Sequence, residues 1–155
     1  MQLARWQDIH HDASFDLVTS FHVFEHLASP LTALRRAASW LKSDGLLYVE
    51  VPDGPKGLTS KGFGSFHFAH VIGFSHPNLI LAAGRAGLTP VRTLSPTAII
   101  FRKDPGAVDL HALTARAKSA AAQYRHTTKP GTAFLRYQWS KASRFWNVRK
   151  FGFVG

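Results

Sequence analysis

The spacing of apolar residues changes from a continuous, strand-like run to helical spacing within the first 41 residues. A short run rich in aromatic and β-branched residues, 15–22, is typical of a buried strand. From Leu31 to Leu41 apolar residues recur at helical spacing, with Pro30 suited to the first helical position and Ser29 suited to the N-cap. This segment therefore predicts a strand followed by a helix.

A second strand is predicted directly after that helix. Asp44 and Gly45 are expected to end the helix, and the apolar run 46–51 has the composition of a strand. Two strands joined by a helix normally lie parallel in one sheet with a right-handed crossover. We expect 15–22 and 46–51 to be neighbours of this kind.

The remainder of the first hundred residues predicts a loop, a helix and a hairpin. Residues 53–75 are rich in Gly, Ser and His and predict a long loop, which is uncommon unless it is functional. A helix is expected over 77–86, ended by Gly87. Runs 89–93 and 98–102 then predict a close antiparallel pair.

Beyond residue 105 the pattern is helical. Asp109 is suited to cap a helix whose apolar face comprises Leu110, Leu113, Ala117, Ala120 and Tyr124. Lys129-Pro-Gly131 interrupts it, and a second helical stripe comprises Leu135, Trp139, Ala142 and Trp146. We therefore divide the chain into an α/β domain over 1–105 and a basic helical extension over 106–155.

The amino-acid composition excludes several kinds of site and indicates the class of protein. The chain has 155 residues, enough for one domain, and 45% of them are hydrophobic, enough for a core. It has no cysteine, which excludes disulfides, thiolate zinc sites, iron–sulfur clusters and cysteine nucleophiles. The first residues lack a signal-peptide core, and no apolar run approaches the ~20 residues that span a bilayer. We expect a soluble, cytoplasmic protein.

Charge is distributed unevenly. The net charge is +10, from 19 Lys and Arg against 9 Asp and Glu, and no acidic residue follows Asp109. Aromatic and basic residues are interspersed in the last 25 residues. Such a segment is suited to docking on another polypeptide, to an anionic membrane surface or to nucleic acid. Of these three, docking is the favoured interpretation.

Several ordered motifs carry a family resemblance. They are the strand 15–21 running into His22-Val-Phe-Glu25-His26, the helix and strand that end at Pro52, and the segment from Ser75-His-Pro to Ala86-Gly-Leu88. This order resembles class I S-adenosylmethionine-dependent methyltransferases over roughly 15–101. The resemblance implies a partial Rossmann-like sheet, with parallel strands plus an antiparallel edge pair, and S-adenosylmethionine across the carboxyl ends of the strands.

The chain departs from the family at one important feature. The family's first strand leads into a Gly-rich loop, and an acidic residue after its second strand binds the donor ribose. Here no glycine precedes Gly45. The chain therefore resembles the C-terminal half of such an enzyme. A missing N-terminal half or a second copy of the chain is an expected partner.

The resemblance places the donor beside Phe21, His22 and Val23. Glu25 and His26, which start the following helix, are candidate donor-binding residues as well. Asp8 is the candidate near the adenine. The alternative is structural: Glu25 favours a helix N-terminus, His26 packs or caps, and Asp8 is solvated.

His67 and His70 in the long loop are the candidate catalytic residues. The loop follows the strand beside which the family binds its acceptor, and histidine can accept a proton near neutral pH. The alternative is that these rings pack the loop onto the sheet.

A third interpretation comes from the sequence H-x-x-E-H at 22–26. This pattern holds zinc when both histidines lie one turn apart on a helix. Because His22 ends a strand, we expect no metal site here.

The function that these features favour is methyl transfer from S-adenosylmethionine to a small-molecule acceptor. The alternative is a non-catalytic binding module with a basic aromatic tail. Donor binding distinguishes these two functions. For the methyltransferase function, we expect the chain alone to bind the donor weakly and to show no methyl transfer.

Overall fold

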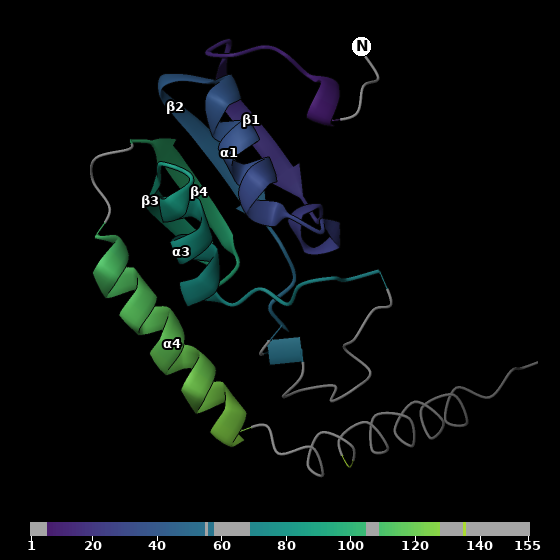
Figure 1. Ribbon diagram of the computed structural model, residues 1–155, viewed down its shortest axis with the longest axis vertical. Coiled ribbons are helices and arrows are strands. Elements are labelled where there is room, and N and C mark those ends of the chain that lie inside the picture. Colours follow the sequence, from purple (N-terminus) through teal and green to yellow (C-terminus); the bar gives the residue numbers. More distant parts are fainter. Residues whose placement is uncertain (1–5, 55, 58–68, 105–108, 128–134, 136–155) are drawn as a thin grey trace, which may run out of the picture.

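The computed structural model describes residues 6–54, 56–57, 69–104, 109–127 and 135. Its strands are β1 (Phe15–Phe21), β2 (Leu41–Glu50), β3 (Leu88–Ser95) and β4 (Ala98–Lys103). Its α-helices are α1 (Pro30–Trp40), α3 (His76–Arg85) and α4 (Leu110–Thr127), and its short 3-10 helices are η1 (Trp6–Asp8) and η2 (Phe24–His26). Figure 1 shows α1 and α3 lying over the sheet and α4 running alongside α3.

The four strands form one mixed sheet in the order β1-β2-β4-β3. β1 and β2 are parallel, whereas β4 is antiparallel to both β2 and β3. The predicted fold class is therefore confirmed: a parallel pair joined by a helix, extended by an antiparallel pair. β1 and β3 are the outer strands among the described residues.

One predicted boundary is wrong. The helix α1 ends at Trp40, not at Gly45, and β2 begins at Leu41, which is fully buried. The register explains the difference, because β1 pairs Phe15 with Leu41 but Leu17 with Leu46. The polar residues between Leu41 and Leu46 therefore bulge out of the parallel ladder.

The backbone geometry of this bulge explains why Asp and Gly occur at positions 44 and 45, where they were expected to end the helix. Asp44 has a φ of 60°, in the left-handed region that Asp tolerates better than most residues. A Cβ on Gly45 would lie 3.0 Å from the Lys42 carbonyl oxygen and 3.1 Å from that of Phe15. The Asp-Gly pair thus marks a close backbone approach inside the strand.

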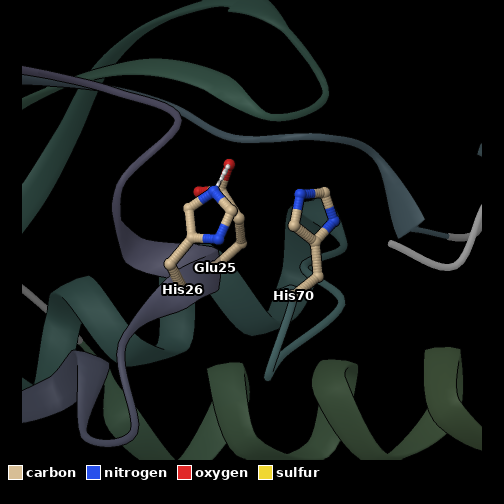
Figure 2. Close-up of side chains that lie close together, drawn as sticks. All are labelled: Glu25, His26 and His70. Atoms are coloured by element: carbon tan, nitrogen blue, oxygen red, sulfur yellow. Dashed lines mark ion pairs between the residues drawn. The ribbon is translucent and has the colours of Figure 1, made fainter. Parts of the chain in front are cut away.

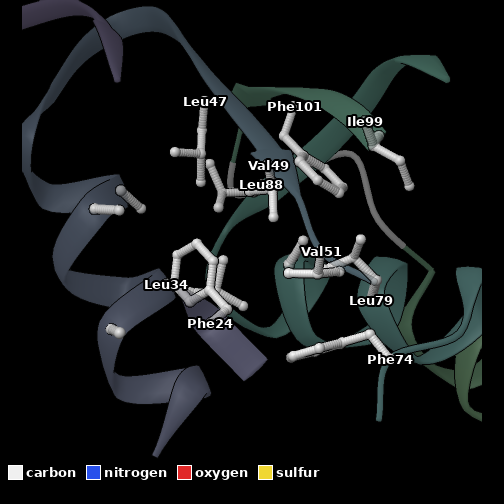
Figure 3. Close-up of a cluster of buried hydrophobic side chains, with 14 of the residues drawn as sticks. Phe24, Leu34, Leu47, Val49, Val51, Phe74, Leu79, Leu88, Ile99 and Phe101 are labelled. Carbon is white, nitrogen blue, oxygen red and sulfur yellow. The ribbon is translucent and has the colours of Figure 1, made fainter. Parts of the chain in front are cut away.

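A hydrophobic core fills the space between the sheet and the helices α1 and α3 (Figure 3). Leu34 of α1 and Leu79 of α3 are fully buried and face Leu47 and Phe101 of the sheet. The buried face of α1 comprises Ala33, Leu34, Ala37 and Ala38. Leu31, predicted to share this face, is only half-buried.

The end of α3 and the start of α4 follow the predicted chemistry, and α3 also has an N-terminal cap that was not predicted. Ser75 and Asn78 form a reciprocal capping box at the start of α3. Gly87 follows its end with a φ of 77°. The Asp109 carboxylate accepts hydrogen bonds from the backbone N–H groups of His111 and Ala112, so it caps α4 as expected.

The domain boundary near 105 lies partly outside the described residues and stays a prediction. None of the helices in the described part of the chain is long and apolar enough to cross a membrane.

Candidate functional site

The carboxyl ends of the two parallel strands lie side by side. Phe21, the last residue of β1, pairs with Glu50, the last residue of β2. The next residue, His22, donates its backbone N–H to the Glu50 carbonyl oxygen at 2.8 Å. In open α/β sheets, ligands bind beyond this edge of the parallel strands.

The chain turns sharply as it leaves β1. His22 has a φ of 52°, a left-handed conformation that is uncommon for a residue other than glycine. The short helix η2 follows at once, and its first residue, Phe24, is buried in the core. The turn and this apolar anchor together bring the next side chain, Glu25, to the inside of the protein.

Glu25 is a buried carboxylate, with only 1% of the residue exposed. Its Oε1 lies 3.4 Å from His22 Nδ1 and 3.7 Å from His26 Nε2. Neither carboxylate oxygen has a hydrogen-bond partner within the described part of the chain. Burying a carboxylate in this way is costly, and such a cost is usual at functional positions rather than structural ones.

A distant segment closes over this carboxylate. The backbone N–H groups of Val71 and Ile72 donate to the Glu25 carbonyl oxygen, at 2.8 and 3.2 Å. His26 Nδ1 donates to the carbonyl oxygen of Ala69 at 2.9 Å. These three bonds place His70 edge-on against His26, with 4.8 Å between ring centroids.

Figure 2 shows the resulting arrangement of Glu25, His26 and His70. One ligating atom from each lies within 4.8 Å of one from each of the others. The three side chains come from η2 and from a segment more than 40 residues later in the chain. The arrangement can hold a cation or move a proton between its members.

Two further side chains at this edge were missed by the sequence analysis. Tyr48 donates its hydroxyl to the Glu50 carboxylate, and this bond, with burial and the charge of Glu50, raises the pKa of Tyr48. Glu50 Oε1 also lies 3.7 Å from His22 Nε2, and the rings of Phe21 and Tyr48 are 5.0 Å apart. The signal was available, because Glu50 lies near the end of the strand 46–51, which was predicted to lie beside 15–22.

Most of the residues predicted to bind the donor lie at the carboxyl ends of β1 and β2, but one lies elsewhere. Phe21, His22 and Val23 are exposed at the end of β1, and His22 joins the cluster through Glu25. Asp8 is exposed in η1; the next residue, Ile9, is held by Arg36 and Trp40 near the end of α1. The neighbourhood of Asp8 is therefore the C-terminal end of α1, whereas Glu25 lies just before the start of that helix, so the structure does not bring Asp8 and Glu25 together (Figure 1).

The predicted loop histidines also divide. His70 lies in the cluster, whereas His67 lies outside the described residues. His76, at the start of α3, is bonded through Nδ1 to the Pro96 carbonyl oxygen instead.

The H-x-x-E-H pattern does not form a helical turn. His22 lies before η2 and His26 within it, so the two histidines do not project from one helix, as the sequence analysis expected. Glu25 nevertheless lies within 4 Å of a ring nitrogen of each.

A comparison with protein-family models bears directly on this edge. Residues 3–93 match a family described as a methyltransferase domain, and this match includes β1, β2, η2 and His70. The chain belongs to this methyltransferase-domain family. The membership and the sheet are both consistent with class I S-adenosylmethionine-dependent methyltransferases. Among proteins of curated function, none matches the chain.

Proposed function

We propose that this chain binds S-adenosylmethionine at the carboxyl ends of β1 and β2 and serves methyl transfer to a small-molecule acceptor. The observation that carries the proposal is the turn after β1. It lies inside the methyltransferase match and combines an unusual backbone conformation at His22 with a buried, hydrogen-bond-deficient carboxylate at Glu25. Strained backbone and costly polar burial together favour a binding site over a purely structural turn.

The surface that would face the donor is already exposed. Phe21 is 57% exposed, and the His22 side chain is 55% exposed. An aromatic ring and an imidazole at a strand end suit the flat adenine and polar ribose of the donor. Glu25, behind them, is suited to position His22 rather than to touch the donor.

Methyl transfer depends mainly on holding donor and acceptor in line, with removal of the acceptor proton as a second contribution. His70 is the candidate base within the described residues, because it is half-buried beside the same edge. His67 keeps the same candidate role by its place in the sequence.

A partner polypeptide forms part of the proposal. β1 is an outer strand of the sheet that the described residues form, and Phe15, Leu17 (56% exposed) and Phe21 are exposed on it. An edge strand with unpaired backbone groups and exposed apolar side chains is prone to pair with another chain. We propose that a polypeptide carrying a Gly-rich strand–loop–helix adds to this edge and completes the donor pocket, with self-association of the chain as the competing outcome.

The basic C-terminal segment supports a second, separate proposal. Nine basic and no acidic residues follow Asp109. A segment of this charge binds anionic surfaces through long-range attraction that salt weakens.

Titration calorimetry with S-adenosylmethionine tests the donor proposal. The 155-residue chain lacks the family's Gly-rich loop and ribose carboxylate, and each unpaired donor group costs roughly 1–3 kcal/mol. Two such losses together lower the affinity for the donor by about tenfold to ten-thousandfold relative to a complete site. His22→Ala should weaken binding further, and His76→Ala should leave it unchanged. No detectable heat at millimolar donor, or equal loss in both variants, would contradict the proposal.

A further inference from the structure

Three groups that commonly bind metal ions converge at the end of β1, and methyl transfer as proposed above does not require all of them. They are a carboxylate, Glu25, and two imidazoles, His26 and His70. Exposed acidic clusters are common, but this carboxylate is almost completely buried. The cluster therefore calls for an explanation of its own.

We propose that Glu25, His26 and His70 form a binding site for a divalent transition-metal ion of the zinc type. Two imidazoles and one carboxylate are a ligand set that zinc and its neighbours in the first transition row prefer. In a tetrahedral zinc site, ligand atoms about 2.0–2.1 Å from the metal lie about 3.4 Å from one another. Glu25 Oε1 and His26 Nε2 are 3.7 Å apart, close to this spacing.

The orientation of His26 fits the role of a ligand. Its Nδ1–H donates to the Ala69 carbonyl oxygen at 2.9 Å, so in the neutral ring the lone pair is on Nε2, the nitrogen nearer Glu25. A backbone carbonyl that fixes the tautomer in this way is the usual outer-shell partner of a metal-bound histidine. The same bond holds the segment that carries His70.

Glu25 provides an independent observation. Both of its oxygens are buried and lack a hydrogen-bond partner in the part of the chain that the structure describes. Buried carboxylates are normally either hydrogen-bonded, paired with a cation or bound to a metal. Its nearest ring nitrogens belong to the half-exposed His22 and His26, at 3.4 and 3.7 Å. A bound cation would offset the charge directly.

The site would leave one coordination position open. Three protein ligands with an exchangeable fourth position are typical of catalytic rather than structural zinc. His22 Nδ1 lies 3.4 Å from Glu25 Oε1, so His22 can influence the Glu25 ligand without belonging to the three-ligand group. An oxygen of water or of an acceptor molecule is the class of ligand that would bind there.

Metal binding and proton removal by His70 are competing roles. A His70 nitrogen that binds the metal cannot also accept a proton, whereas an acceptor hydroxyl bound to the metal would lose its proton more readily. Zinc would therefore inhibit transfer if the base role holds alone. The metal site itself rests on geometry and does not depend on the donor proposal.

Zinc titration against a competing chelator tests the site. The full 155-residue chain, free of any polyhistidine tag and stripped with EDTA, should bind one equivalent of Zn²⁺. His26→Ala and His70→Ala should each weaken binding by at least tenfold, in line with losses seen when even outer-shell partners are removed. Glu25→Gln should weaken it as well.

The matched controls are other histidines of the chain. A double variant, His10→Ala with His11→Ala, removes the adjacent pair near the N-terminus, and His76→Ala removes a ring bonded to a different carbonyl. Both should bind Zn²⁺ within twofold of the original chain. Unchanged affinity in the His26 and His70 variants, or loss only in the double variant, would overturn the proposal.

A second measurement covers variants that fail to fold. Imidazole ¹⁵N resonances of the original chain should shift for His26 and His70 on adding Zn²⁺, with His76 unmoved. Absence of these shifts at stoichiometric Zn²⁺ would overturn the proposal. Donor calorimetry repeated in EDTA separates the two hypotheses, because loss of metal binding leaves the donor result standing and loss of donor binding leaves the zinc result standing.

Discussion

Replacing Glu25 by leucine should stabilise the metal-free protein while removing its site. The carboxylate is buried, neither oxygen is hydrogen-bonded among the described residues, and the backbone around it is held by its own carbonyl group rather than by its side chain. Leucine is of similar size and needs no hydrogen bond. The substitution therefore removes a polar burial cost and leaves the bonds from Val71 and Ile72 in place.

The change in the free energy of unfolding is the difference between the burial cost that is removed and the ion-pair attraction that is lost. A buried polar group without a partner costs about 1–3 kcal/mol, and more when charged. Against this, Glu25 loses attraction to His22 and His26, whose side chains are 55% and 38% exposed. Solvent-exposed charges contribute about 0–1 kcal/mol to such pairs. Subtracting this loss leaves an expected gain of about 0–3 kcal/mol in the free energy of unfolding. Each kcal/mol corresponds to about 2–4 °C in Tm.

Urea denaturation in EDTA, followed by circular dichroism, measures this change. The control is Glu50→Leu, the same substitution at the same sheet edge. Glu50 is partly exposed and accepts a hydrogen bond from Tyr48, so its loss should cost about 0.5–1.5 kcal/mol. Destabilisation of the Glu25→Leu variant by 1 kcal/mol or more would refute the reasoning, because it would show that the carboxylate is well satisfied in the folded protein.

Three further predictions concern other parts of the chain. Hydrogen bonds from backbone N–H groups, that of Ala112 first, lower the pKa of Asp109 below 3.8. The Asp109 cap on α4 is therefore fully present above pH 3.8 and is lost as the pH falls through the lowered pKa. The amide chemical shift of Ala112 should follow this loss, and Asp109→Asn should abolish the pH dependence. Glu50→Ala should lower the pKa of Tyr48 toward 10.0 in an ultraviolet titration, and an unchanged value would show that the hydrogen bond does not raise it. Deleting the residues after Lys129 should reduce retention on heparin in a salt-dependent manner; equal retention would mean that the basic segment is packed away.

Much of the fold could be predicted because its signals are local. Pro30, the capping residues of α3 and α4, and Gly87 act on the backbone within a few residues. The start of β2 could not be predicted in this way. It depends on pairing between Leu41 and Phe15 across 26 positions, and on a bulge that only the register with β1 defines.

The site shows the same division. The turn after β1 was predictable from the motif at 22–26, because strand ends are ligand positions in parallel sheets. The partnership of His26 with His70 was not, since it depends on backbone bonds from Val71 and Ile72 to Glu25 across some 45 residues. The burial of Glu25 was also hidden, because a carboxylate near a helix start is ordinarily exposed.

Amide chemical-shift mapping during titration with S-adenosylmethionine tests the central claim most directly, because it detects weak binding and locates it. The shifts should concentrate at residues 21–26, at Glu50 and at 69–72, and should saturate at millimolar rather than micromolar donor. Excess S-adenosylhomocysteine, which shares the adenosine part of the donor, should shift amides of the same residues. Shifts that avoid residues 21–26, or no shifts at millimolar donor, would contradict the assignment of the donor site to the carboxyl ends of β1 and β2.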